Sequence, residues 1–100
     1  MKYQIILTKQ ARKDLKSLEK YQQEKLVSDY STIQNESIDV VNIKSLGNKL
    51  FEIKTDNLRS LFMYKEGRII VIGVIFIKKT QKTPKQYMEK ALRILTNYKD

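Results

Sequence analysis

The clearest pattern in the chain is a run of nine residues without a polar side chain, Ile69–Ile77. Such a run is typical of a strand that is buried on both faces. Two segments of alternating character precede it, Leu50–Thr55 and Leu58–Lys65, and short turns at Asp56-Asn57 and Glu66-Gly67 join the three. The pattern therefore predicts a three-stranded antiparallel meander in which Ile69–Ile77 is an interior strand.

The N-terminal part reads as one strand followed by two helices. Tyr3–Leu7 is expected to pair with the free side of Ile69–Ile77. Thr8 is a candidate N-cap for the first helix, and a break near Lys20–Gln22 separates it from the second. The two apolar stripes are Ala11, Leu15 and Leu18 in the first helix, and Leu26, Tyr30 and Ile33 in the second. We expect an antiparallel helical hairpin that packs on the sheet, with Tyr21 and Tyr30 as packing residues.

Two further segments complete the predicted fold. Asn35–Lys49 allows either a short helical turn or an irregular crossing around Val40, Val41 and Ile43, followed by a turn at Gly47-Asn48. Thr83-Pro84-Lys85-Gln86 has the pattern of a capping box that opens a final helix. Its apolar stripe is Tyr87, Ala91, Ile94, Leu95 and Tyr98. The prediction is one α+β domain over residues 1–100, with a small, mainly antiparallel four-stranded sheet, an N-terminal helical hairpin and a C-terminal helix.

The amino-acid composition limits the kinds of partner and of metal site that the chain can have. Twenty Lys and Arg residues against eleven Asp and Glu give a net charge of +9, which favours an anionic partner. Without cysteine or histidine the chain lacks the commonest metal ligands, so we expect no metal site and no cofactor. No targeting segment is visible and the longest apolar run is too short to span a membrane, so we expect a soluble, cytoplasmic protein.

Charged residues gather where the meander strands begin and end. Alternation places Glu52 and Lys54 on one face of their strand, and Arg59 lies near the start of the next. Lysines without an intervening acid follow the buried run, at Lys78, Lys79, Lys82 and Lys85. We expect these cations and one carboxylate to converge at one side of the sheet and to bind a polyanion.

Such a site suits RNA cleavage by in-line attack of a 2′-hydroxyl. That reaction requires the hydroxyl to lose a proton, the phosphorane charge to be stabilised and the 5′-oxygen to gain a proton, and cations supply the second requirement. Tyr64 or Tyr87 would provide a phenol for proton transfer or for stacking on a base.

The same residues also allow a structural interpretation, in which they have no binding or catalytic function. Lys54 and Arg59 would then form surface ion pairs with Glu52 or Asp56, and the lysines of residues 78–85 would belong to a solvated loop. Tyr87, which lies on an apolar helical stripe, would be a core residue.

Three stretches of the C-terminal half form a recognisable motif set. They are Leu50-Phe51-Glu52-Ile53-Lys54, Leu58-Arg59-Ser60-Leu61-Phe62-Met63-Tyr64, and Phe76-Ile77-Lys78-Lys79-Thr80-Gln81-Lys82-Thr83-Pro84, followed by the helix of Tyr87 and Ala91. The set resembles the RelE/ParE toxin superfamily, specifically its phage-derived HigB-like branch, to which the Phe-x-Lys-Lys-Thr-x-Lys-Thr-Pro stretch is quite specific. The first half matches only in its pattern of a strand and a helical hairpin.

The resemblance implies the toxin of a type II toxin–antitoxin system. Its activity would be that of a metal-independent, ribosome-dependent endoribonuclease (an mRNA interferase) that inhibits translation and arrests growth. The implied partners are the ribosome, mRNA and a cognate HigA-like helix-turn-helix antitoxin in a hetero-oligomer. Carried over onto this sequence, the catalytic candidates are Lys54, Arg59, Lys79, Tyr87 and Glu52, and the RNA-binding candidates are Lys78, Lys82, Lys85 and Tyr64.

Two positions depart from the pattern of that branch. Lys54 stands where arginine is common, and lysine offers a point charge instead of a bidentate fork. Val74-Ile75 stands where a histidine-glycine pair is common, which leaves the general base open. Two other functions also stay open: a ParE-like topoisomerase inhibitor and a non-catalytic RNA-binding module. Relatives of the ParE type typically lack converging basic residues, which argues against the inhibitor.

Overall fold

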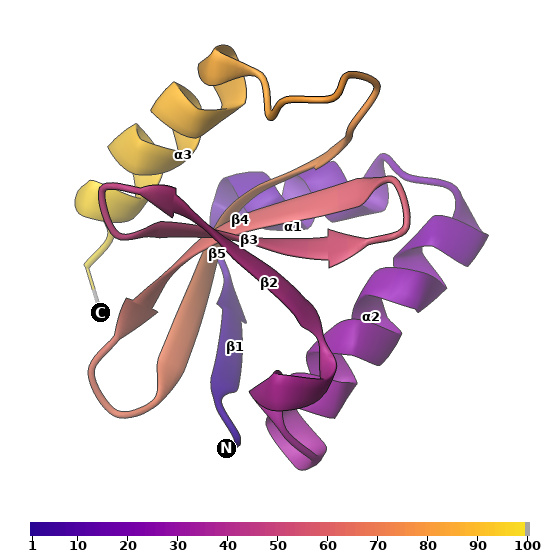
Figure 1. The fold of residues 1–100 in the computed structure, drawn as a ribbon, viewed down its shortest axis with the longest axis vertical. Helices are drawn as coiled ribbons and strands as arrows, with labels where there is room; N and C mark the ends of the chain where they lie inside the picture. Colours follow the sequence, from indigo (N-terminus) through magenta and orange to yellow (C-terminus); the bar gives the residue numbers. More distant parts are fainter. Residues whose placement is uncertain (100) are drawn as a thin grey trace.

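A five-stranded mixed sheet with helices on both faces forms the framework of the molecule (Figure 1). The computed structural model describes residues 1–99. In chain order the elements are β1 (Gln4–Leu7), α1 (Lys9–Lys16), α2 (Lys20–Asn35), a 3₁₀ turn η1 (Ile38–Val40), β2 (Asn42–Gly47), β3 (Leu50–Thr55), β4 (Leu58–Lys65), β5 (Ile69–Ile77) and α3 (Lys85–Thr96).

The strand order is β1-β5-β4-β3-β2. The strands β2 to β5 pair antiparallel with their neighbours, while β1 pairs parallel with β5. The predicted meander and the position of Tyr3–Leu7 beside the apolar run are therefore confirmed. Because β5 has a strand on each side and packed side chains on both faces, nearly every residue of the run is buried.

The sheet has five strands instead of the predicted four. The additional strand is β2, which lies in the segment whose structure was left open and pairs antiparallel with β3. As an edge strand it buries little, with Ile43 and Leu46 half-buried and the residues around them exposed. A short strand with one paired edge needs few apolar residues, so its alternation is weak in the sequence.

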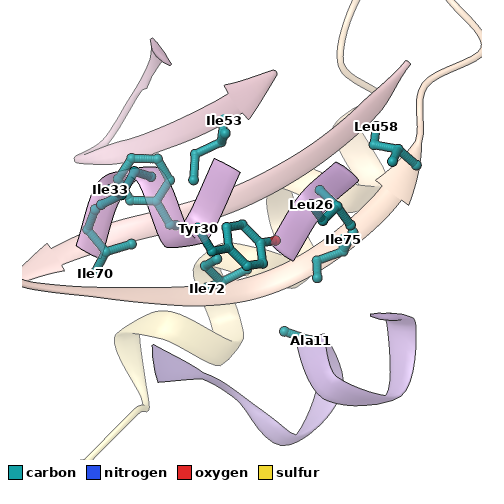
Figure 2. Packing of buried hydrophobic residues seen from close by; sticks show 10 residues of the cluster. Ala11, Leu26, Tyr30, Ile33, Ile53, Leu58, Ile70, Ile72 and Ile75 are labelled. Atoms are coloured by element: carbon teal, nitrogen blue, oxygen red, sulfur yellow. The ribbon is translucent and has the colours of Figure 1, made fainter. Parts of the chain in front are cut away.

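The helices divide between the two faces of the sheet. Side chains of α1 and α2 pack on one face, and Figure 2 shows Leu26, Tyr30 and Ile33 of α2 gathered with Ile53 and Ile72 of the sheet. The helix α3 packs on the other face through Ala91 and Leu95. All three predicted apolar stripes are thus confirmed. The prediction for Tyr21 was wrong, because this side chain is 61% exposed on the outer side of α2.

Thr8 caps α1 as predicted. Its Oγ1 accepts a hydrogen bond from the Ala11 N–H at 3.1 Å, and it also donates to the carbonyls of Ile72 and Gly73. The interhelical break falls slightly earlier than expected, since α2 already begins at Lys20. Glu19 and Gln22 form the capping box of that helix.

The predicted capping box at Thr83 was wrong. Pro84 is the N-cap of α3, and no side chain caps the helix there. The hydroxyl of Thr83 instead donates a hydrogen bond to a buried carboxylate in β3. Among the described residues, no helix combines the length and apolar character that crossing a membrane requires.

Candidate functional site

One face of the sheet collects charged side chains near the end of β3. Glu52 and Lys54 alternate with Ile53, which packs under α2, so both point to the face covered by α3. Register partners share a face, which brings Lys44 beside Glu52 and Arg59 beside Lys54. The predicted alternation of β3 therefore holds, and it places residues of three strands together.

These residues surround an open cavity of about 360 Å³. It is lined by Asn42, Ile43, Lys44, Glu52, Lys54, Arg59, Lys78 and Gln81. We call it the lysine cavity. Four cations and one carboxylate line it, so positive charge is in excess. Asn42 and Lys44 were missed as site residues because strand β2 was not recognised, although their polar positions alternate with apolar ones.

A buried ion pair forms one wall of the lysine cavity. Arg59 Nε lies 2.7 Å from Glu52 Oε1, and the two side chains are only 8% and 4% exposed. The Nε hydrogen is not aligned with that oxygen, so this is a charge contact without hydrogen-bond geometry. Arg59 Nη1 donates to the carbonyls of Asp56 at 2.7 Å and Leu58 at 2.9 Å. The guanidinium is thus held on several sides.

The second oxygen of Glu52 is also occupied. Thr83 Oγ1 donates to Glu52 Oε2 at 3.0 Å. Because both carboxylate oxygens have partners and the residue is only 3% exposed, Glu52 is placed to orient Arg59 and the segment of Thr83. The same contacts leave it poorly placed to accept a proton from a substrate.

Two lysines that line the cavity, Lys54 and Lys78, differ in their exposure and in their contacts. Lys54 is exposed, and within residues 1–99 it forms no ion pair, since Asp56 pairs with Lys25 instead. Lys78 is half-buried, and its backbone N–H donates to the carbonyl of Asn57 at 2.7 Å. The structural interpretation therefore applies to Arg59, as a buried pair with Glu52, but does not apply to Lys54.

Lys79 and Tyr87 line a different cavity, of about 340 Å³, between α1, β5 and α3. Tyr87 stacks on Phe76 with ring centroids 4.0 Å apart and planes 6° from parallel. Phe76 is the register partner of Arg59, so Tyr87 lies one layer above the strand that borders the ion pair. The structure thus distributes the catalytic candidates over two neighbouring cavities.

The remaining candidates lie away from the lysine cavity. Lys82 is exposed, and Lys85 is exposed with Nζ 3.8 Å from Glu89 on the next turn of α3. Tyr64 lies on the opposite face near the far end of β4, in an aromatic cluster with Tyr3, Phe51 and Phe62. Partial burial in this cluster raises the pKa of the Tyr64 phenol.

The described residues contain no group of three or more His, Cys, Asp or Glu side chains that is arranged to hold a metal ion.

Residues 13–96 match the model of one family, described as "Phage derived protein Gp49-like (DUF891)". No curated protein matches the chain in sequence.

Several solved structures share the fold. The toxin–antitoxin complex RelBE2 of Mycobacterium tuberculosis has a chain that is 20% identical, with a TM-score of 0.65 over 80% of this chain and 95% of that one. The RelE–RelB complex of Pyrococcus horikoshii OT3 gives 17% identity and a TM-score of 0.62 over 79% and 98%. The isolated RelE toxin of E. coli gives 17% identity and 0.58 over 93% and 99%. The predicted RelE-like α+β fold is confirmed.

Proposed function

The chain belongs to the Phage derived protein Gp49-like family, and from this premise we propose that it is the toxin of a type II toxin–antitoxin system. Its activity would be ribosome-dependent, metal-independent cleavage of mRNA in the cytoplasm, as in the HigB-like branch. Support comes from the fold, which it shares with chains of the M. tuberculosis toxin–antitoxin complex and with the E. coli toxin.

The observation that carries this proposal is the charge of the lysine cavity. Lys44, Lys54 and Lys78 surround a carboxylate that Arg59 already neutralises, so their charges are available to an incoming anion. A groove with this excess of cations attracts a nucleic-acid backbone and releases its counterions. The same cations would stabilise the additional negative charge that develops on a phosphorane.

Residue roles follow from the contacts. Lys54 and Lys78 would contact the scissile phosphate and its neighbour, while Arg59, held by Glu52 and two carbonyls, would contribute a fixed positive charge at the wall. Tyr87 or a lysine remains the candidate for moving the proton. Outside the cavity, Lys79, Lys82 and Lys85 would bind further phosphates of the RNA strand.

The proposed partners are mRNA on the ribosome and a HigA-like helix-turn-helix antitoxin. The structures from M. tuberculosis and P. horikoshii are complexes with an antitoxin or with RelB, which supports an antitoxin partner for this chain. The type of antitoxin is proposed from the resemblance to the HigB-like branch.

A non-catalytic RNA-binding module is the second candidate. One observation favours it: Glu52 is the one carboxylate among residues 1–99 that lines the lysine cavity, and both of its oxygens already have partners. In that case the cavity would bind phosphates without activating a 2′-hydroxyl.

The deciding experiment is induced expression without antitoxin, with primer extension to map mRNA ends. If the protein is an mRNA-cleaving toxin, we expect growth arrest and codon-positioned cuts in mRNA. The double variant Lys54→Ala/Lys78→Ala should lose both effects. The control Lys16→Ala, which removes an exposed lysine from α1, should retain them. Intact mRNA with normal growth would support the non-catalytic module. Intact mRNA with stalled replication would support a ParE-like inhibitor.

A further inference from the structure

The segment between β5 and α3, residues 78–84, arches out from the end of β5 and returns to the start of α3 (Figure 1). It contributes Lys78 and Gln81 to the lining of that cavity. Its side chains are exposed or half-buried, so packing alone holds it weakly. A segment of this kind opens readily unless specific polar contacts tie it to the sheet.

Two hydrogen bonds tie it, one near each end. The backbone N–H of Lys78 donates to the Asn57 carbonyl at 2.7 Å, in the turn between β3 and β4. Thr83 Oγ1 donates to Glu52 Oε2 at 3.0 Å, across 31 residues of sequence. Between the two ties, Thr80 Oγ1 donates to the carbonyl of Lys82 and closes a local turn.

The tie at Thr83 is stronger than an ordinary surface contact. Its acceptor is a carboxylate that is 3% exposed, and a hydrogen bond to an ionised acceptor is stronger than one between neutral groups. The acceptor is itself held in place, because Arg59 contacts its other oxygen and donates to two backbone carbonyls. Thr83, Glu52 and Arg59 thus form one connected network, which we call the Thr83 network.

We infer that Thr83 is a positioning residue, whose hydrogen bond to Glu52 holds the lysine-bearing segment over the cavity before RNA arrives. This inference rests on the proposed function in so far as RNA is the ligand. A segment that is already ordered loses less conformational entropy on binding, so its lysines contribute more to affinity. Losing the hydroxyl weakens RNA binding through Lys78 and its neighbours, although Thr83 itself need not touch the RNA.

The test compares purified Thr83→Val, which keeps the branched shape without the hydroxyl, with Thr83→Ser, which keeps the hydroxyl. Thr96→Val is the matched control, because its hydroxyl bonds only to carbonyls within the exposed end of α3. The first measurement is limited trypsin cleavage after Lys78, Lys79 and Lys82. The second is binding of a short single-stranded RNA in which 2′-deoxy substitution prevents cleavage.

Because Glu52 Oε2 loses its donor, we expect Thr83→Val to lower the thermal midpoint by several degrees. Within the folded protein, we expect cleavage in the segment about tenfold faster and RNA binding several-fold weaker. Thr83→Ser should restore both quantities, and Thr96→Val should alter neither. Unchanged trypsin cleavage and unchanged RNA affinity in Thr83→Val would overturn the inference. Failure of the proposed function shows separately, as intact mRNA when the unsubstituted protein is expressed without antitoxin, and the trypsin comparison would still decide whether Thr83 holds the segment.

Discussion

Glu52 and Arg59 face each other diagonally across β3 and β4 as a buried ion pair, with Oε1 and Nε 2.7 Å apart. Each side chain is nearly excluded from solvent, so neither charge is well hydrated. The pair thus depends on its own partners for compensation. A substitution that removes one charge has a different consequence from a substitution that removes both.

Glu52→Gln should therefore destabilise the protein by about 3–5 kcal/mol, because it leaves the Arg59 charge buried without a counter-ion. The measurement is the free energy of unfolding from urea denaturation. The double variant Glu52→Gln/Arg59→Met removes both charges and should recover much of that loss. A stability for Glu52→Gln equal to that of the unsubstituted protein would contradict a structural role for the pair.

Tyr30 should make stability depend on alkaline pH. Burial raises the pKa of its phenol well above the ordinary value near 10, and its hydroxyl pairs with the Ser60 hydroxyl at 2.6 Å. Below the unfolded-state pKa both states hold the proton and the contribution to stability is complete. Above it the unfolded state ionises first, so the contribution is lost as the pH rises, by up to about 1.4 kcal/mol per pH unit.

The comparison is with Tyr30→Phe, which should cost about 1–2 kcal/mol at neutral pH because Ser60 loses its partner. The difference between the two proteins in unfolding free energy should shrink as the pH rises above about 10. Tyr21→Phe, at a side chain that is 61% exposed, is the control and should change neither value. A pH-independent difference for Tyr30→Phe would refute the assignment.

Gly73 allows α3 to approach the sheet. A Cβ at this position would lie 2.9 Å from Leu95 Cγ, and Leu95 is fully buried. Gly73→Ala should thus cost about 1–3 kcal/mol in unfolding free energy through overpacking. In a double-mutant cycle with Leu95→Ala, the double variant should lose less stability than the sum of the single variants, since the cavity accepts the new methyl group. Simple additivity would argue against the close contact.

If RNA phosphates bind in the lysine cavity, removing its lysines should change how RNA affinity depends on salt concentration. Lys54→Ala and Lys78→Ala should each weaken binding of a non-cleavable single-stranded RNA and reduce the slope of log K against log salt by about 0.7 per lost phosphate contact. Fluorescence anisotropy over a salt series measures both. Lys16→Ala on α1 controls for net charge, and an equal change of slope in that variant would place the RNA elsewhere.

Much of the fold was predictable because its signals are local. The nine apolar residues of β5 and the alternation of β3 report directly which faces are buried. The stripe of α2 likewise identified Leu26, Tyr30 and Ile33 as core residues. Strand β2 was missed because an edge strand with exposed polar positions carries little of this signal.

Tyr21 shows the limit of residue type as a guide. Tyrosine is compatible with a core and with a surface, and Tyr21 lies on the solvent side of a helix whose stripe is made by other residues. Thr83 shows a second limit. The pattern Thr-Pro-Lys-Gln is typical of a capping box, yet the hydroxyl bonds to a carboxylate 31 residues away, which no local pattern reveals.

The sequence by itself determined four of the five strands, the helical stripes and the face on which Glu52, Lys54 and Arg59 lie, because the periods of strands and helices translate directly into burial. Only the tertiary structure decided which charges meet. It paired Arg59 with Glu52, left Lys54 free of ion pairs within residues 1–99, and separated Lys79 and Tyr87 into a second cavity. The physical reason is that a side chain's partners depend on strand register and on segments distant in sequence. Burial makes pairing obligatory for Arg59 and Glu52, whereas the exposed Lys54 is hydrated and needs no partner.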